Sequence, residues 1–392
     1  MFERDIVTTL QKRLSEPRKF IQIVVGPRQT GKSTAVYQAL EKIKSPIVQF
    51  SFDRPRDQNA KRLEKVWDEA RLLLVDSDEV VLSLDEVQKV PDWSSTVKYL
   101  WDNDTFNKRN IKVILTGSSA LTIKSGMAES LKGRYEEIQS TQWTFSECSE
   151  AFGYSLDDFL FFGGYPGSAP LIDDVDRWFA YMHDSIIGPT LMQDVLEMET
   201  VRKPAVLRAL FEIGAAYSSQ EISYRKLLGQ LDDKGNTETI SYYLTLLSHV
   251  GMLSGLKKYD NKLIRSKSSS PRLMVHDTSL MTATLEVSPE ILMKDKAMRG
   301  HLVESAVGAY LIGRSMVDRF SLYWWRERDA EVDFVITKGK KVTALKVKSG
   351  HVKNIKGLGV FVSKFPGIYS MVVGSDTCPL DEFLLGNVPL FQ

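Results

Sequence analysis

The feature that most constrains the fold of this 392-residue chain is the glycine-rich segment GPRQTGKS at residues 26–33. The apolar run IQIVV precedes it, and the helix-like stretch STAVYQAL begins at Ser33. A strand, a glycine-rich turn and a helix in this order form a P-loop, where backbone N–H groups and the positive end of the helix dipole face phosphate oxygens. The segment therefore predicts a phosphate-binding loop within an α/β domain.

Each position of this segment suits phosphate binding for its own chemical reason. Gly26 and Gly31 let the backbone curve so that successive N–H groups point at the phosphates. Lys32 is expected to reach the β- and γ-phosphates, and Ser33 to offer its hydroxyl to magnesium. We therefore expect ATP and Mg²⁺ as cofactors. The expected nucleotide-binding residues are Gly26, Pro27, Arg28, Gln29, Thr30, Gly31, Lys32, Ser33 and Thr34.

A second apolar run, VVLSL at residues 80–84, leads directly into Asp85 and Glu86. An acid at the end of a strand near the loop can hold the magnesium shell of a bound nucleotide. We expect Asp85 to do so, directly or through water, and Glu86 to orient and activate the attacking water. A second acid directly after Asp85 favours an ATPase over a small-molecule kinase.

Two further segments hold candidates for catalysis. The run IKVILT is followed by Gly117 and two serines, Ser118 and Ser119, which are equal candidates for positioning water. A simple turn is the alternative. Arg134, in the sequence LKGRY, would stabilise charge in the transition state, either in its own subunit or in a neighbouring one. The alternative for Arg134 is an ordinary surface arginine.

Strand and helix patterns alternate along the first part of the chain. Strand-like runs at residues 20–25, 46–52, 80–84 and 111–116 are separated by helical stretches. This alternation predicts a parallel sheet with helices on both faces. It stops near residue 145, and strand patterns return at residues 321–325, 331–337 and 341–347.

Composition excludes several classes of function. The chain has 51 basic and 50 acidic residues, so its net charge of +1 gives no whole-molecule attraction to nucleic acid or membranes. It has no apolar run of about 18 residues, which a membrane span needs. Its charged N-terminal segment does not have the pattern of a signal peptide. We expect a cytoplasmic protein without a membrane partner, and the sequence leaves its oligomeric state open.

Residues 205–275 have the pattern of a winged helix, with three helical stretches followed by a hairpin. Within the hairpin lies a cluster of basic residues that would neutralise phosphates of DNA. Its members are Lys257, Lys258, Lys262, Arg265, Lys267 and Arg272. The third helical stretch, in contrast, exposes no arginine or lysine that would read base edges. Nonspecific DNA contact, sequence-specific reading and a role in protein contacts all remain open.

Several sequence blocks follow in a fixed order along nearly the whole chain. They are GPRQTGKST from Gly26, LDEVQKVPDW from Leu84, ILTGSSA from Ile114, LKGRY from Leu131, FLFFGGYPG from Phe159, MVHDTSLMTA from Met274, RGHLVES from Arg299, YWWRERDAEVDFVI from Tyr323 and ALKVKSG from Ala344. This set resembles prokaryotic AAA+-type P-loop ATPases that carry a C-terminal DUF4143 region.

The resemblance implies three domains. Residues 1–200 would form the ATPase domain, with a helical lid at about residues 145–200. Residues 201–285 would form the winged helix, and residues 286–392 a DUF4143-like domain with a degenerate restriction-endonuclease-like fold. The resemblance also implies that the glycine turn at residues 163–166 closes on the nucleotide.

In that C-terminal fold, acids normally hold divalent cations and a lysine supports the attacking water. The matching positions here are Glu304, Asp333 and the segment Lys346-Val347-Lys348. Lys346 stands where the pattern requires an acid, so one metal ligand is replaced by a repelling charge. We therefore expect no nuclease activity, and we expect Glu304 and Asp333 to pair with Lys346 or Lys348.

Together these observations predict a magnesium-dependent ATPase that acts as a nucleotide-driven switch or motor on a protein or nucleic-acid partner. Two alternatives belong to other classes. One is an ATP-gated DNA-binding regulator with little turnover, and the other is an ATP-dependent nuclease.

Overall fold

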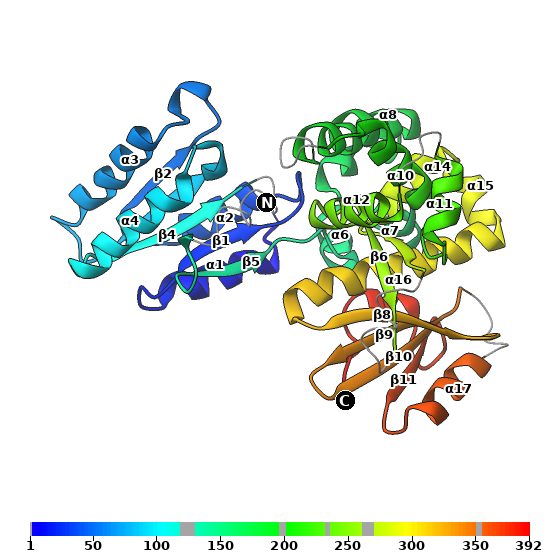
Figure 1. Cartoon of the computed structure of the whole chain (residues 1–392). Helices are drawn as coiled ribbons and strands as arrows, with labels where there is room; N and C mark the ends of the chain where they lie inside the picture. The colour runs from blue at the N-terminus through cyan, green and yellow to red at the C-terminus, as the bar shows by residue number, and fades with distance from the viewer. Residues whose placement is uncertain (1, 118–129, 196–200, 232–235, 261–269, 350–354) are drawn as a thin grey trace. The chain divides into compact units, whose positions relative to one another are not determined.

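The computed structural model describes the chain except residue 1 and residues 118–129, 196–200, 232–235, 261–269 and 350–354 (Figure 1). It divides into two compact units, Met1–Thr141 and Gln142–Gln392. Among the described residues, no helix has both the length and the apolar character that crossing a membrane requires.

The first unit contains a five-stranded sheet with the order β2-β3-β4-β1-β5, in which all neighbours are parallel. Its strands are β1 (Ile21–Val25), β2 (Ile47–Ser51), β3 (Val80–Asp85), β4 (Ile111–Thr116) and β5 (Tyr135–Gln139). The parallel α/β fold expected from the sequence is confirmed for this unit. Because the strands are parallel, all their carboxyl ends lie at one edge of the sheet.

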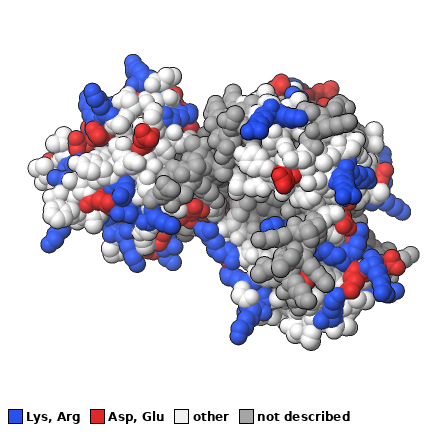
Figure 2. Space-filling model, viewed as in Figure 1, with Lys and Arg blue, Asp and Glu red and all other residues white. Residues whose placement is uncertain are grey.

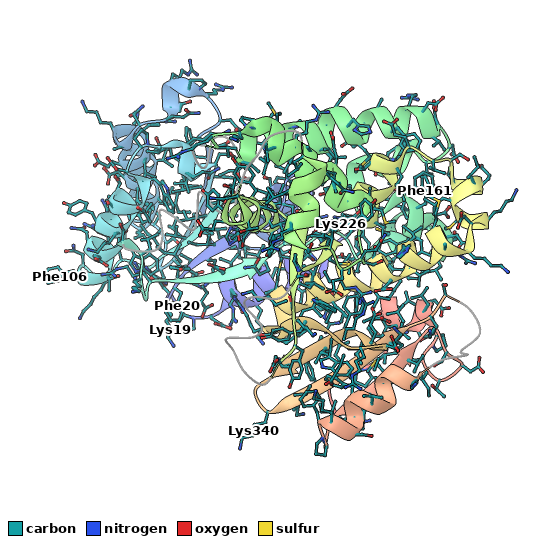
Figure 3. The ribbon with its side chains drawn as sticks, turned by 45° about the vertical axis from the view of Figure 1, so that its right-hand side comes forward. Lys19, Phe20, Phe106, Phe161, Lys226 and Lys340 are labelled. Carbon is teal, nitrogen blue, oxygen red and sulfur yellow. The ribbon has the colours of Figure 1, made fainter. Side chains whose placement is uncertain are left out.

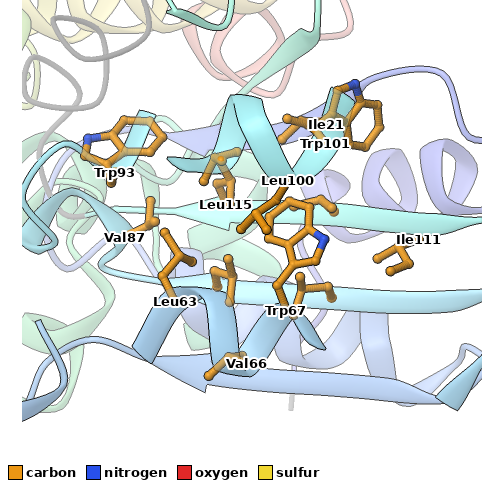
Figure 4. Packing of buried hydrophobic residues seen from close by; sticks show 14 of the residues in the cluster. Ile21, Leu63, Val66, Trp67, Val87, Trp93, Leu100, Trp101, Ile111 and Leu115 are labelled. Carbon is orange, nitrogen blue, oxygen red and sulfur yellow. The ribbon is translucent and has the colours of Figure 1, made fainter. Parts of the chain in front are cut away.

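Helices cover both faces of this sheet. On one face pack α1 (Asp5–Ser15) and α2 (Lys32–Glu41), and on the other α3 (Ala60–Leu73) and α4 (Trp93–Phe106). Side chains of β1 alternate between the two faces, with Ile23 packed towards α3 and α4 and Val24 towards α1 and α2. Figure 4 shows the larger of these two cores, where indole rings and aliphatic side chains fill the space between helices and sheet.

The second unit begins with short helices, α6 (Phe145–Phe152), α7 (Leu156–Phe162) and α8 (Val175–Tyr181). Two π-helical turns follow, Met182–Ile187 and Thr190–Asp194. Phe161 lies among these helices (Figure 3), with its ring 5.5 Å from that of the buried Trp178. The predicted helical character of residues 145–200 is therefore present in the described part of this segment.

The glycine turn after α7 is bound inside the second unit. The carboxylate of Asp277 accepts a hydrogen bond of 2.8 Å from the Gly164 N–H group. A Cβ atom added at Gly163 would lie 1.9 Å from Asp277 Oδ1, so a larger residue would displace this contact. Asp277 also caps α14 (Thr278–Leu285) through Ser279 N–H. The turn thus connects the FLFFGGYPG block with the MVHDTSLMTA block.

Three helices and a strand pair follow in the middle of the chain. They are α10 (Pro204–Ala216), α11 (Tyr224–Gln230), α12 (Thr237–His249), β6 (Leu253–Lys258) and β7 (Arg272–Val275). The two strands are antiparallel. This order matches the pattern from which the winged helix was predicted, and assignment to that fold stays a prediction.

The antiparallel pair is part of a six-stranded sheet with the order β11-β10-β9-β8-β6-β7. The C-terminal strands are β8 (Ser321–Glu327), β9 (Ala330–Lys338), β10 (Lys341–Val347) and β11 (Tyr369–Val373). The long helix α16 (Lys296–Asp318) and α17 (Lys356–Lys364) belong to the same region, with α15 (Pro289–Lys294) before them and α18 (Leu380–Leu384) after them. The middle and C-terminal segments thus share one sheet, and their division at residue 285 stays a prediction.

Candidate functional site: a phosphate loop beside an acidic strand end

The segment between β1 and α2 has the backbone geometry of a phosphate loop. Gly31 is the residue before α2 and has a φ of 83°, in the left-handed region that favours glycine. Gly26 packs so closely that an added Cβ atom would lie 1.8 Å from the Ser140 carbonyl oxygen. Both positions therefore require glycine: Gly26 because of the close approach of Ser140, and Gly31 because of its backbone conformation.

Lys32 is buried, and its ammonium group points into the curve of the loop. Its Nζ atom donates to the Gly26 carbonyl at 3.0 Å and also to the Pro27 carbonyl. Ser33 and Thr34 are exposed at the first turn of α2. A buried ammonium, the first N–H groups of a helix and an exposed hydroxyl together form the donor set that phosphates and their magnesium ion need. The residues present therefore fit MgATP.

Thr30 differs from its neighbours because its side chain is buried. Its hydroxyl lies 3.1 Å from the Pro27 carbonyl and 3.3 Å from the Ser140 hydroxyl. Only the backbone of Thr30 is thus placed to face a phosphate, whereas its side chain supports the loop.

Asp85 is the last residue of β3, at the carboxyl edge of the sheet. The Thr116 hydroxyl, at the end of the neighbouring strand β4, donates to Asp85 Oδ1. Burial raises the pKa of Asp85, and the charge of Glu86 raises it further, although the bond from Thr116 acts in the opposite direction. A divalent cation at this carboxylate would offset the burial.

The oxygen ligands near this edge are of the kinds that magnesium takes beside a nucleotide. No group of three or more His, Cys, Asp or Glu side chains in the described ranges is arranged to hold a metal ion. Magnesium usually keeps several waters and takes one or two carboxylates together with phosphate oxygens. Asp85 and Ser33 provide ligands of the right kind for such a site.

Glu86 follows Asp85 with a φ of 54°, an unusual left-handed conformation for a residue with a side chain. Its Oε2 atom accepts a hydrogen bond of 2.9 Å from the Gln88 amide and lies 3.2 Å from Lys89 Nζ. Lys89 Nζ also lies 2.8 Å from Asp53 Oδ1. The predicted base is thus held by an amide and an ammonium group.

Sequence reasoning missed Asp53 and Lys89. Asp53 follows β2, which pairs with β3, and the bond from Lys89 is the largest cause that lowers the pKa of Asp53. The charge of Arg28, from the phosphate loop, contributes in the same direction. A signal was present, because Asp53 is a polar residue directly after an apolar run, as Asp85 is.

Ser118 and Arg134 were the other two residues predicted to be catalytic. Ser118, like Ser119, lies outside the described residues. Arg134 precedes β5, and its carbonyl oxygen accepts from the Ile21 N–H group at the start of β1. It therefore lies at the amino edge of the sheet, about 16 Å from the loop at the usual rise per residue of a strand.

At that edge, the Arg134 guanidinium forms two bonds with the Asp102 carboxylate, at 2.7 and 2.9 Å. This position does not support a role in the same subunit. A role towards a neighbouring subunit stays a prediction.

The basic hairpin cluster is described only in part. Lys257 is exposed, and Lys258 lies 5.9 Å from the Trp324 ring. Lys262, Arg265 and Lys267 lie outside the described residues. Figure 2 shows basic and acidic groups next to each other on the visible surface of both units.

For Arg272, the prediction of a phosphate-contacting side chain is wrong. Its residue is only 5% exposed, and its guanidinium faces three carboxylates inside the second unit. It pairs with Glu304, lies 3.2 Å from Glu331 and 3.7 Å from Asp333. The sequence alone did not show that this strand turns its arginine inward.

The structure brings Glu304 and Asp333 together with Lys346. Lys346 Nζ lies 2.6 Å from Asp333 Oδ1, and the Val347 N–H group donates to Asp333 Oδ2 at 2.7 Å. Burial raises the pKa of Glu304, although the charge of Arg272, with which it pairs, opposes this shift. These acids therefore have cations of the chain itself as partners.

Three family models match the chain in succession. An AAA domain matches residues 18–149, a domain of unknown function (DUF8612) matches residues 153–291, and a second one (DUF4143) matches residues 299–383. The first match covers the sheet, the phosphate loop and the acidic strand end.

Two relatives are uncharacterized proteins. One, from Methanocaldococcus jannaschii, is 24% identical over 336 residues, which are 81% of this chain and 72% of the relative. The other, from Haemophilus influenzae, is 25% identical over 262 residues, which are 62% of this chain and 63% of the relative.

A solved structure, the Walker-type ATPase PABY2304 of Pyrococcus abyssi, is similar with a TM-score of 0.50 and 14% identity. The match covers 73% of this chain and 96% of that protein. At this identity the similarity concerns the fold.

Proposed function

Because an AAA domain matches residues 18–149 and a DUF4143 domain matches residues 299–383, we propose that this chain is an ATPase that binds MgATP at residues 26–34 and hydrolyses it. One observation carries the proposal. The phosphate loop with Lys32 and Ser33, and the acid pair Asp85–Glu86, lie at the same carboxyl edge of one parallel sheet. This arrangement supports a shared site for phosphate donors and carboxylates.

Each residue has a defined part in the proposed reaction. Lys32 exchanges the loop carbonyls for oxygens of the β- and γ-phosphates. Ser33 and Asp85 would hold the magnesium shell, and Mg²⁺, when bound, would neutralise charge on the phosphates. Glu86 accepts a proton from the attacking water as the general base.

Lys89 and Asp53 support this base. Lys89 holds Glu86 from one side, because its ammonium nitrogen lies 3.2 Å from Glu86 Oε2. Asp53 holds Lys89 from the other side at 2.8 Å. The pair therefore helps to fix the position of Glu86.

The biological output is a nucleotide-dependent change that reaches the second unit, which acts on a protein or nucleic-acid partner. The exposed Lys257 supports nonspecific contact with phosphates of DNA. The buried Arg272–Glu304–Asp333 cluster supports the proposal that the C-terminal region has no nuclease activity, because its acids already have cationic partners.

Equilibrium binding of ATP tests the proposal directly. Lys32→Ala removes the ammonium that meets the β- and γ-phosphates, so we expect a loss of affinity of at least about 100-fold, near the upper range for a hydrogen bond to a charged group. Arg109→Ala, a partly exposed arginine at the other edge of the sheet, serves as the matched control and should leave the affinity unchanged. Equal affinities of wild type and Lys32→Ala would contradict the assignment of the loop.

A further inference from the structure

Arg4, which immediately precedes α1, is buried against the phosphate loop. It is only 6% exposed, and its Nη1 atom donates to the Thr30 carbonyl oxygen at 2.9 Å. The same guanidinium reaches the Ser140 hydroxyl at 3.3 Å and the Thr141 carbonyl oxygen at 3.1 Å. One side chain thus joins the loop to the last two residues of the first unit.

The loop and this segment also contact each other directly. The Ser140 N–H group donates to the Val25 carbonyl at 2.7 Å, and the Ser140 hydroxyl lies 3.3 Å from that of Thr30. The Ser140 carbonyl oxygen fills the space where a side chain at Gly26 would lie. Because Gly26 and Thr30 both contact Ser140, we expect a movement of the loop to displace Ser140.

The N-terminal residues hold the helix after the loop as well. The Gln38 amide of α2 donates to the Phe2 carbonyl at 2.9 Å, and Lys42 Nζ lies 2.5 Å from Glu3 Oε2. Residues 2–4 thus bind α2, the loop and the end of the first unit. The contacts of residues 2–4 therefore extend beyond the helix α1 that they precede.

Nucleotide binding changes the bonds on which this arrangement depends. Lys32 donates to the Gly26 and Pro27 carbonyls, and the Pro27 carbonyl also accepts from the Thr30 hydroxyl. When Lys32 turns to phosphate oxygens, these carbonyls lose a charged donor. The effect reaches Thr30, and Thr30 is bonded to Arg4 and lies beside Ser140.

We propose that Arg4 is a positioning residue that transmits the state of the phosphate loop to Ser140 and Thr141, through which the first unit continues into the second. The inference rests on the proposed binding of ATP. It adds the contacts through which that binding would affect Ser140 and Thr141. Arginine suits this task because its planar guanidinium reaches acceptors on two sides at once. A lysine ammonium keeps the charge but cannot span both the Thr30 and Thr141 carbonyls.

Amide hydrogen exchange of the full-length protein tests this route. The peptide covering residues 138–144 is followed without nucleotide and with a saturating non-hydrolysable ATP analogue. For wild type we expect nucleotide to change the exchange rate by about threefold or more, since local opening energies respond to lost or gained bonds. Arg4→Met should abolish this change and weaken ATP binding roughly tenfold, as expected for a charge-assisted hydrogen bond.

Arg18→Met is a matched control. Arg18 also donates to backbone carbonyls in the first unit, those of Ile111 and Trp101, but it does so at the amino edge of the sheet. Its loss should lower stability while leaving ATP affinity and the exchange response unchanged. Arg4→Lys should restore ATP affinity to within about threefold through its charge, yet fail to restore the exchange response.

Ser140→Ala removes one acceptor of Arg4 and gives a second variant that does not depend on Arg4 itself. We expect a reduced exchange response with nearly normal ATP affinity. A full response in Arg4→Met or in both Arg4→Lys and Ser140→Ala would overturn the inference, as would a loss of response in Arg18→Met. Wild type that binds ATP without any response at residues 138–144 would refute the inference alone, whereas wild type that does not bind ATP would refute the proposed function too.

Discussion

The two units contain similar sets of charged residues in opposite settings. At the sheet edge of the first unit, Asp85, Glu86 and Lys89 lie beside a loop with exposed hydroxyl groups. In the second unit, Arg272 and Asp333 are almost fully buried, and cations and acids form pairs with one another. The first set lies at a sheet edge beside exposed hydroxyl groups of the loop, while the second set is enclosed within the chain.

This difference shows why residue types alone do not identify a site. Acids and a lysine also occur together around Asp333. There, however, the guanidinium of Arg272 lies between the carboxylates, where a metal ion would otherwise bind. Breaking a buried pair leaves an unpaired charge at high energetic cost, whereas exposed pairs contribute little. Substitutions should therefore affect reaction rate in the first set and stability in the second.

The largest expected effect is that of Glu86→Gln on hydrolysis. Glutamine keeps the size and the bond from Gln88 but cannot accept a proton, so the rate should fall by roughly 10²–10⁴-fold. ATP affinity and the unfolding transition should stay close to those of wild type. Phosphate release under single-turnover conditions measures the step, and Glu64→Gln on the outer side of α3 is a control that should react normally. A near-normal rate in Glu86→Gln would place the base elsewhere.

The next largest effect is expected for Arg272, where the substitution should change stability and leave nucleotide binding unchanged. Arg272→Met should destabilise the second unit by about 3–5 kcal/mol, because Glu304 and Asp333 lose a buried partner. Urea unfolding followed by circular dichroism measures this, and ATP affinity should stay unchanged. Addition of Glu304→Gln should recover part of the loss, since one unpaired acid is removed. An Arg272→Met protein of normal stability would contradict the assignment of this cluster to the structural core.

A smaller effect should follow from two adjacent buried residues, His276 and Asp277. Burial lowers the pKa of His276 to about 4 from 6.5, so this residue contributes stability that is lost as pH falls from 6.5 to 4. Burial raises the pKa of Asp277 to about 6 from 3.8, so its contribution is lost as pH rises over that range. The two contributions oppose each other between about pH 4 and pH 6.

His276→Gln should remove the contribution of His276 and leave the opposing contribution of Asp277 to the pH dependence of stability. The difference in unfolding free energy between wild type and variant should grow by about 3 kcal/mol from pH 4 to pH 6.5, because each pH unit corresponds to about 1.4 kcal/mol. Urea titrations at several pH values measure it, with Ser254→Ala as a control that removes the hydrogen bond to His276 but not the imidazole. A difference that is independent of pH would show that His276 is protonated or solvated in the folded chain.

The smallest effect concerns DNA binding by the hairpin. If Lys257 contacts a phosphate, Lys257→Ala should weaken binding equally for all sequences and reduce the salt dependence by about one unit of slope. The same change should follow for Lys258, Lys262 and Arg265. Fluorescence anisotropy with a short duplex at several salt concentrations measures this, and Lys340→Ala at the β9–β10 turn is the control. An absence of DNA binding by wild type at low salt would favour a protein-contact role.

The parts of the site that the sequence predicted are those encoded by adjacent residues. The loop from Gly26 to Ser33 and the pair Asp85–Glu86 are continuous motifs, and the strands that precede them are apolar runs. The strands expected at residues 321–325, 331–337 and 341–347 are also confirmed, within β8, β9 and β10. In each case the pattern that defines the element is local.

The parts that could not be predicted depend on contacts between distant residues. Arg4 meets Ser140, which lies 136 positions away, and Arg272 meets Asp333 across two strands of one sheet. In a strand as short as β7, the alternation of polar and apolar residues does not show which face of the sheet is buried. The prediction that Arg272 is a surface residue was therefore wrong. Arg134 comes after β4 along the chain, but it directly precedes β5, which runs parallel to β1. It therefore lies at the amino edge of the sheet, opposite the phosphate loop.

Phosphate release by wild type in the presence of Mg²⁺ tests the central claim most directly. We predict steady release of phosphate from ATP that stops when magnesium is removed by EDTA, because Ser33 and Asp85 then have no ion to hold. Lys32→Ala should release none under either condition. Absence of turnover in wild type with Mg²⁺, or undiminished turnover in Lys32→Ala, would contradict the account.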